Sequence, residues 1–184
     1  RNVRPTRLLE AGFRFVKPTI EDFFEGTDHA AVDRLDLHRY MGTWYEIARF
    51  DHRFERGLSE VTATYTLMPD GTVRVENRGC KHKKPYDVCK TAEGRAKIPD
   101  PSQPGKLKVS FFLSFYSDYY VLELDQDEYN YALIGSSSDK YLWILSRAPI
   151  LPEEIKKKLL DAATRRGYDV KKLIWVEQRE KKIM

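Results

Sequence analysis

Apolar and polar residues alternate along the middle of the chain, between residues 33 and 147. In the segment VTATYTL, for example, Val61, Ala63 and Tyr65 lie on one side and threonines on the other. This period of two is typical of strands that bury one face. The turn at 68–72, with the sequence Met-Pro-Asp-Gly-Thr, has the residues of a hairpin connection. Consecutive antiparallel strands of this kind can close on themselves and remove their exposed edges. The pattern therefore predicts an all-β fold built as a closed meander.

The spacing of apolar residues becomes helical only after residue 151. Pro152 stands at the predicted helix start, two glutamates follow in the first turn, and Gly167 is placed to end the helix. The stripe of this helix, residues 152–166, would cover apolar side chains that the strand at 141–147 turns outward. Residues 173–178 are expected to form one short final strand.

The predicted inner face of the sheet mixes small residues with large aromatic ones, and aromatic residues make up 12% of the chain. A filled barrel would favour Val, Ile and Leu throughout, so small residues on several strands indicate free space. Asn77 places a polar group on this face, and it needs a partner when buried. The pattern leaves open a ligand cavity or a filled barrel in which Asn77 is satisfied. The candidate lining residues are Ala63, Tyr65, Val75, Asn77, Val109, Phe111, Tyr120, Leu122 and Trp143.

Two short motifs give the chain a family resemblance. Gly42-Thr43-Trp44 matches the Gly-x-Trp motif on the first strand of lipocalins, and Arg147 in YLWILSR matches the arginine that ends their eighth strand. The third motif is reduced to Asp127 within Gln-Asp-Glu. Longer blocks over about residues 33–178 resemble the branch that contains bacterial outer-membrane lipocalins, apolipoprotein D and plant temperature-induced lipocalins.

This resemblance implies an eight-stranded antiparallel up-and-down barrel with a C-terminal helix packed on its outside. Gly42, Trp44 and Arg147 would then seal the closed end, with the guanidinium on the indole. The resemblance also implies binding of fatty acids, lysophospholipids or similar lipids, in an extracytoplasmic, outer-membrane-associated bacterial setting. We expect residues 33–184 to form the lipocalin domain and residues 1–32 to be an extension. A signal peptide or lipid-anchoring cysteine would precede Arg1.

Cys80 and Cys89 flank the segment 81–88. By alternation both point out of the barrel, at the two ends of one hairpin, so a cross-strand disulfide is expected in an oxidising compartment. Two free thiols are the alternative. In the lipocalin layout this hairpin borders the open mouth, where a basic rim could hold a lipid head group or could simply be solvated. The rim residues are Lys81, His82, Lys83 and Lys84.

Charge is concentrated at the amino end. Residues 1–20 carry the whole net charge of +4, because they hold five basic residues and a single acidic one, Glu10. This basic arm suits an acidic or membrane surface, or it is a solvated tail. Because the body is neutral and has no basic stripe, nucleic acid is not an expected partner. We expect a monomer or homodimer whose partner is a lipophilic small molecule.

Few features of the sequence indicate catalysis. The four histidines lack metal-ligand spacing, and no nucleophile or phosphate-loop motif occurs. We therefore expect no enzyme activity, metal or cofactor. Glu46 is the exception, because alternation from Trp44 turns its carboxylate into the barrel, where it needs a donor or a raised pKa. Two alternatives to lipid carriage stay open: an enzyme that uses Glu46, and an interaction module that uses residues 1–32.

Overall fold

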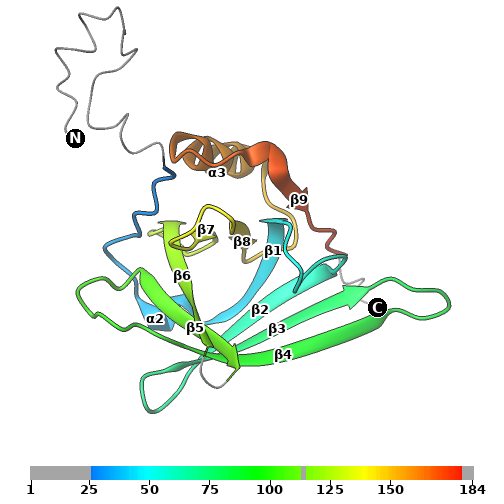
Figure 1. Ribbon diagram of the computed structural model, residues 1–184, viewed down its shortest axis with the longest axis horizontal. Helices are drawn as coiled ribbons and strands as arrows, with labels where there is room; N and C mark the ends of the chain where they lie inside the picture. The colour runs from blue at the N-terminus through cyan, green and yellow to red at the C-terminus, as the bar shows by residue number, and fades with distance from the viewer. Residues whose placement is uncertain (1–25, 113–114, 180–184) are drawn as a thin grey trace, which may run out of the picture.

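The computed structural model describes residues 26–112 and 115–179. Eight strands of this part of the chain form a closed antiparallel barrel in up-and-down order (Figure 1). Closure comes from β1, which pairs with both β2 and β8, while the short strand β9 continues the sheet beyond β1. The predicted fold class is therefore confirmed. The strands are β1 (Gly42–Phe50), β2 (Ser59–Leu67), β3 (Val73–Lys81), β4 (Val88–Lys97), β5 (Lys106–Phe112), β6 (Phe115–Leu124), β7 (Tyr131–Gly135), β8 (Trp143–Ser146) and β9 (Leu173–Trp175).

Helix α3 (Glu153–Arg165) lies on the outside of the barrel, as expected. Leu159 and Ala163 of the helix are buried against Leu142 and Ile144, so the outward apolar side chains of the wall are covered. Gly167 ends the helix at φ +94°, a conformation that favours glycine. A short 3-10 helix, η2 (Val170–Lys172), then leads into β9. No helix of the described residues is long and apolar enough to span a bilayer.

A short helix that the sequence pattern did not predict, α2 (Leu37–Tyr40), crosses one end of the barrel. Asp36 caps it by accepting hydrogen bonds from the first turn. The chain before it runs along the barrel wall, where the Val32 backbone N–H donates to the carbonyl of Val121. Most of the predicted extension, residues 1–25, lies outside the described residues.

The prediction that Tyr120 and Leu122 line the interior is wrong. Both belong to the cluster between the barrel wall and α3, and Leu122 is buried there. The register shifts once between Val109 and Phe112 and again between Val121 and Glu123. Because each bulge reverses the inward and outward positions beyond it, Tyr119 and Val121 face inward instead.

Candidate ligand-binding site

The inner wall of the barrel is mostly apolar. Val73, Val75 and Val121 are buried in it. Other inward side chains on the same wall are only partly buried. A partly exposed side chain that faces the interior borders space that solvent can reach. These partly buried residues include Ala63, Val109, Phe111 and Trp143, and Asn77, two positions from Val75 on β3, is also partly buried.

One end of the barrel is sealed by Trp44 and Arg147. Trp44 is fully buried, and the Arg147 guanidinium lies 3.9 Å from the centroid of its ring. The same guanidinium donates to the carbonyls of Arg39, Thr43 and Tyr129, which belong to three separate segments. It therefore ties the bottom of the barrel together through hydrogen bonds as well as a cation–π contact.

Glycine is required at position 42 for two reasons. Its φ is +95°, and a Cβ atom there would lie 3.3 Å from Nη1 of Arg147. A side chain would therefore be strained and would press on the seal. The glycine of the Gly-x-Trp motif is therefore required by its backbone conformation and by the position of Arg147.

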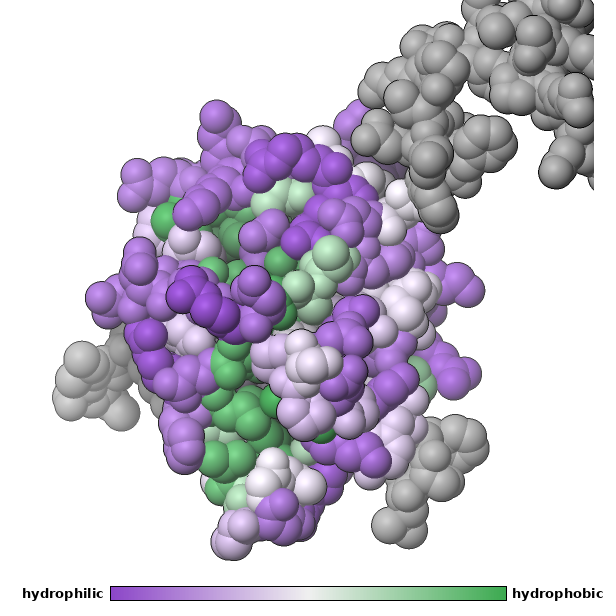
Figure 2. All heavy atoms as spheres, turned by 90° about the vertical axis from the view of Figure 1, so that its left-hand side faces the viewer, coloured by the Kyte–Doolittle hydropathy of each residue, from purple (hydrophilic) through white to green (hydrophobic). Residues whose placement is uncertain are grey.

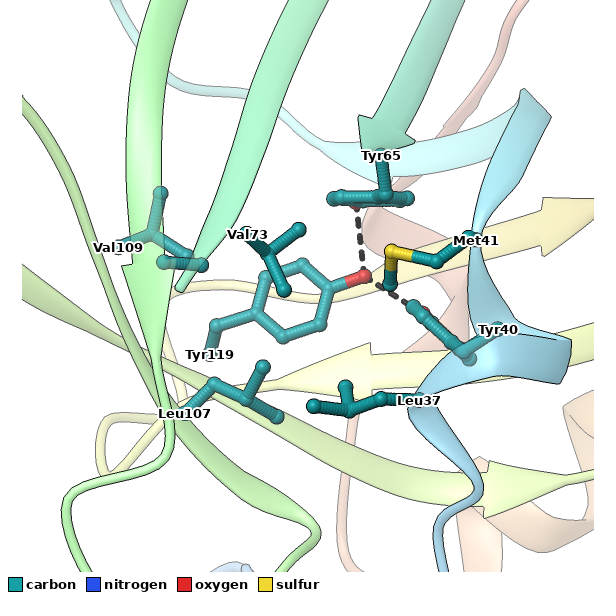
Figure 3. A pocket seen from close by; sticks show the side chains of 9 residues that line it. Leu37, Tyr40, Met41, Tyr65, Val73, Leu107, Val109 and Tyr119 are labelled. Carbon is teal, nitrogen blue, oxygen red and sulfur yellow. Dashed lines mark hydrogen bonds between the residues drawn. The ribbon is translucent and has the colours of Figure 1, made fainter. Parts of the chain in front are cut away.

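The side chains of Tyr40, Tyr65 and Tyr119 point toward one another and join through their hydroxyls (Figure 3). The hydroxyl of Tyr119 lies 2.6 Å from that of Tyr40 and 2.8 Å from that of Tyr65. Beside them is a small void of about 10 Å³ lined by side chains that include Leu107 and Val109. We call these three residues the tyrosine triad, and it forms the floor of the barrel interior.

The opposite end is crossed by the loop at 51–58, held down by a buried polar cluster. Nη1 of Arg49 donates to Oε1 of Glu46 at 3.0 Å, and both side chains are buried. Nη2 of Arg49 donates to the backbone carbonyls of Glu55 and Leu58. Arg49 therefore links β1 to the loop, and Glu46 has the inward arginine partner that its position requires.

The Glu55 carboxylate extends this cluster to the neighbouring strand β8. Its Oε1 accepts from Nε1 of Trp143 on β8 at 3.1 Å and lies 2.8 Å from Nε2 of His52. Burial raises the pKa of Glu46 well above its ordinary value, and the nearby Glu55 raises it further. Burial also opposes ionisation of Glu55, but hydrogen bonds from His52 and Glu46 lower its pKa to about 2. The pKa values of the two carboxyls are therefore shifted in opposite directions, so the proton is favoured on Glu46 and the negative charge on Glu55.

The hairpin of β3 and β4 projects beyond this end of the barrel (Figure 1). Cys80 and Cys89 are directly paired across it and form the predicted disulfide. Lys81, Lys83 and Lys84 are exposed on the hairpin, but His82 is not free. Its Nε2 lies 2.7 Å from the Ser59 hydroxyl, and its Nδ1 lies 2.9 Å from Oδ1 of Asp87.

A second hollow lies on the outside of the sealed end. It has a volume of about 410 Å³ and is bordered by Leu37, the turn at 70–72 and residues of the segment 97–104. Figure 2 faces this side of the molecule and shows hydrophobic surface between polar side chains. The sequence pattern gave no sign of this groove, because loops and α2 form it jointly.

Sequence reasoning missed several polar residues of the interior. Glu46 was recognised as inward-facing, but its partners Arg49 and Glu55 were not. Tyr40 and Tyr119 were also missed. Strict alternation along the strand places Arg49 on the outward face. The bulge between Glu46 and Ala48 turns it inward instead. The same bulge turns Ala48 out of the barrel, into the cluster beneath α3.

The closed barrel, the Trp44–Arg147 seal and the apolar inner wall are features of the class of barrel proteins that bind small hydrophobic molecules. A family model described as a lipocalin-like domain matches residues 35–178. The chain belongs to the lipocalin family, whose members bind small hydrophobic molecules.

The similarity to curated relatives extends over most of the chain. It is 50% identical over 147 residues to the outer membrane lipoprotein Blc of Citrobacter freundii, covering 80% of this chain and 81% of that one. It is 42% identical over 158 residues to temperature-induced lipocalin-1 of Arabidopsis thaliana, covering 81% and 82%. To apolipoprotein D of Mus musculus it is 34% identical over 154 residues, covering 79% and 78%. The branch that the motifs indicated is thereby confirmed.

Solved structures agree on the fold. Insecticyanin from the tobacco hornworm Manduca sexta superposes with a TM-score of 0.67 at 23% identity, covering 83% of this chain and 86% of that one. At this level of identity the similarity concerns the barrel architecture alone.

Proposed function

We propose that this protein binds small lipophilic molecules, such as fatty acids or lysophospholipids, inside the barrel and carries or stores them without chemical change. The observation that carries this proposal is the apolar inner wall on which Ala63, Val109, Phe111 and Trp143 remain partly exposed. Each methylene group of an acyl chain that leaves water for such a wall gains about 0.8 kcal/mol. An acyl chain is therefore a suitable occupant, and the ordering cost of binding limits the affinity.

The head group would stay at the open end. Lys81, Lys83 and Lys84 are exposed on the projecting hairpin, and Lys81 lies against Gly57 of the loop that crosses the opening. Ammonium groups suit a carboxylate or phosphate there. His82 is held in place at this rim by Ser59 and Asp87.

The setting that we propose is extracytoplasmic and associated with the outer membrane, in line with the names of the bacterial relatives. Phe54, in the loop at 51–58, and Tyr86, on the hairpin near Lys84, are both well exposed, which supports a peripheral contact with a membrane surface. The protein would act there as a monomer or homodimer.

Native mass spectrometry tests the proposal directly. Delipidated protein is mixed with a panel of fatty acids, lysophospholipids and diacyl phospholipids. We expect one lipid per barrel, with single-chain lipids preferred. A protein that retains none of the panel would contradict lipid binding.

A further inference from the structure

The hydrogen bonds of the tyrosine triad leave one proton unused. Each hydroxyl of Tyr40, Tyr65 and Tyr119 can donate one hydrogen bond. The triad has three such protons, but only two bonds join its hydroxyls. Whichever way the two bonds run, one O–H remains, and these hydroxyls have no other hydrogen-bond partner among the described residues. A buried donor without an acceptor is costly, so the site is complete only when another oxygen is present.

The unused donor lies where the leading end of a ligand would arrive. The Tyr40 ring packs against Trp44 with centroids 5.0 Å apart, so the seal is directly beneath the triad. Tyr119 is only partly buried, and a small void borders the triad. From Ser59 at the open end to Tyr65, strand β2 spans about 20 Å at roughly 3.3 Å per residue. A long acyl chain inserted from the open end therefore reaches the triad with its far end.

The triad suits a neutral oxygen better than a charged one. Burial raises the pKa of all three hydroxyls, so they stay protonated donors. A single spare donor can satisfy a hydroxyl or carbonyl oxygen. A carboxylate would need several donors to offset its loss of hydration.

We propose that the tyrosine triad is a binding subsite for a neutral acceptor oxygen, hydroxyl or carbonyl, at the deep end of the ligand. This inference rests on the proposed lipid binding and narrows the ligand class. The preferred ligand has a polar head group at the open end, an apolar middle, and an oxygen at its far end.

The test compares palmitic acid with ω-hydroxypalmitic acid, which differ only at the far end. Their dissociation constants are measured by calorimetry for the wild type and for the triple variant Tyr40→Phe/Tyr65→Phe/Tyr119→Phe. All three hydroxyls must be removed, because any smaller set still leaves at least one spare donor. Replacing the whole group with rings of the same shape leaves no unpaired hydroxyl and is close to neutral for folding. We expect the preference for the ω-hydroxy acid over palmitic acid to fall about five-fold in the variant.

The matched control removes three hydroxyls from the outer cluster, as Tyr45→Phe/Tyr120→Phe/Tyr131→Phe. It should keep the preference of the wild type. An unchanged preference in the triad variant would overturn the subsite. A preference that rises, because palmitic acid loses more affinity than the ω-hydroxy acid, would overturn it too and would place the carboxylate at the floor. A wild type that binds neither acid would remove the proposed lipid binding itself.

A measurement on the wild type covers the case in which the triad variant does not fold. ω-Hydroxypalmitic acid labelled at its terminal carbon is bound, and nuclear Overhauser contacts from that carbon's protons are recorded. Contacts to the Tyr119 ring support the subsite. Contacts to Trp143 near the open end, without contacts to Tyr119, would overturn it.

Discussion

Arg147 covers the fully buried ring of Trp44, with its guanidinium carbon 3.9 Å from the ring centroid. The indole N–H of Trp44 donates to the carbonyl of Tyr40. The ring is therefore held by Arg147 over its face and by this hydrogen bond at its edge. These two residues are more than a hundred positions apart in sequence, at the start of β1 and just after β8. Their contact therefore joins the two ends of the barrel wall where it closes.

Loss of the indole should be the more severe change at this seal. Trp44→Ala removes the largest buried side chain and opens a cavity, so we expect a loss of about 3–5 kcal/mol in the free energy of unfolding. Arg147→Ala should cost less, because it removes a half-buried cation whose carbonyl partners can turn to water. Urea denaturation of both variants measures the difference. Wild-type stability in Trp44→Ala would show that the seal is not structural.

Glu46 and Glu55 should make the free energy of unfolding depend on pH in opposite directions. The folded protein holds the Glu46 proton more tightly than the unfolded chain does, because the folded pKa is raised. The contribution of Glu46 is therefore fully present below its ordinary pKa of 4.5 and is lost as pH rises towards the folded value. Glu46→Gln removes this titration but keeps a donor for Glu55. We expect urea denaturation to show a decline with rising pH in the wild type that is smaller in Glu46→Gln.

Glu55 provides the reverse case. Its pKa is lowered to about 2, so its contribution is present above its ordinary value of 4.5 and is lost as pH falls towards 2. Glu55→Gln should flatten the acid side of the stability profile and leave the alkaline side nearly unchanged. Identical profiles for wild type and both variants would mean that the two carboxyls do not interact as described.

The disulfide should stabilise the projecting hairpin. Cys80 and Cys89 are nine positions apart, and closing a loop of that size contributes about 2–3 kcal/mol in the chain-entropy model. The double variant Cys80→Ser/Cys89→Ser should lose this amount, and reduction of the wild type should lose a similar amount. Thermal unfolding with and without reductant checks the comparison. If reductant shifted the unfolding of the serine variant as well, another effect would be responsible.

Leu122 distinguishes the two faces of β6. It is buried between the barrel wall and α3, so Leu122→Ala should cost about 2–5 kcal/mol of stability without weakening fatty-acid binding. Val109→Ala, on the inner wall, should weaken binding and cost less stability. Calorimetric titration with palmitic acid, combined with urea denaturation, separates the two effects. Weaker binding in Leu122→Ala than in Val109→Ala would mean that Leu122 lines the barrel interior.

The sequence predicted the fold well wherever strands alternate without interruption. Val61 and Tyr65 on β2, for example, are buried as expected. It failed at Tyr120 and Leu122, because strict alternation cannot place bulges, and each bulge exchanges the two faces of a strand.

The polar groups of the interior were harder to predict than its apolar wall. Glu46 stood out as a charge at an inward position, but its partner Glu55 lies in a loop, where no periodicity applies. The tyrosine triad joins α2, β2 and β6, and only the closed barrel brings these three elements together. Contacts of this kind depend on tertiary structure, which a single sequence does not encode in any local pattern.

The central claim, that ligands occupy the barrel interior, is tested most directly by filling that interior. Ala63→Phe adds an aromatic ring to the inner wall beside Trp44, whereas Thr66→Phe adds the same ring to an exposed position on the same strand. The affinity for palmitic acid is measured by titration calorimetry for both variants, after circular dichroism has shown that both are folded. We predict at least a ten-fold loss, about 1.4 kcal/mol, in Ala63→Phe and wild-type affinity in Thr66→Phe. Equal affinity in the two variants would contradict binding inside the barrel.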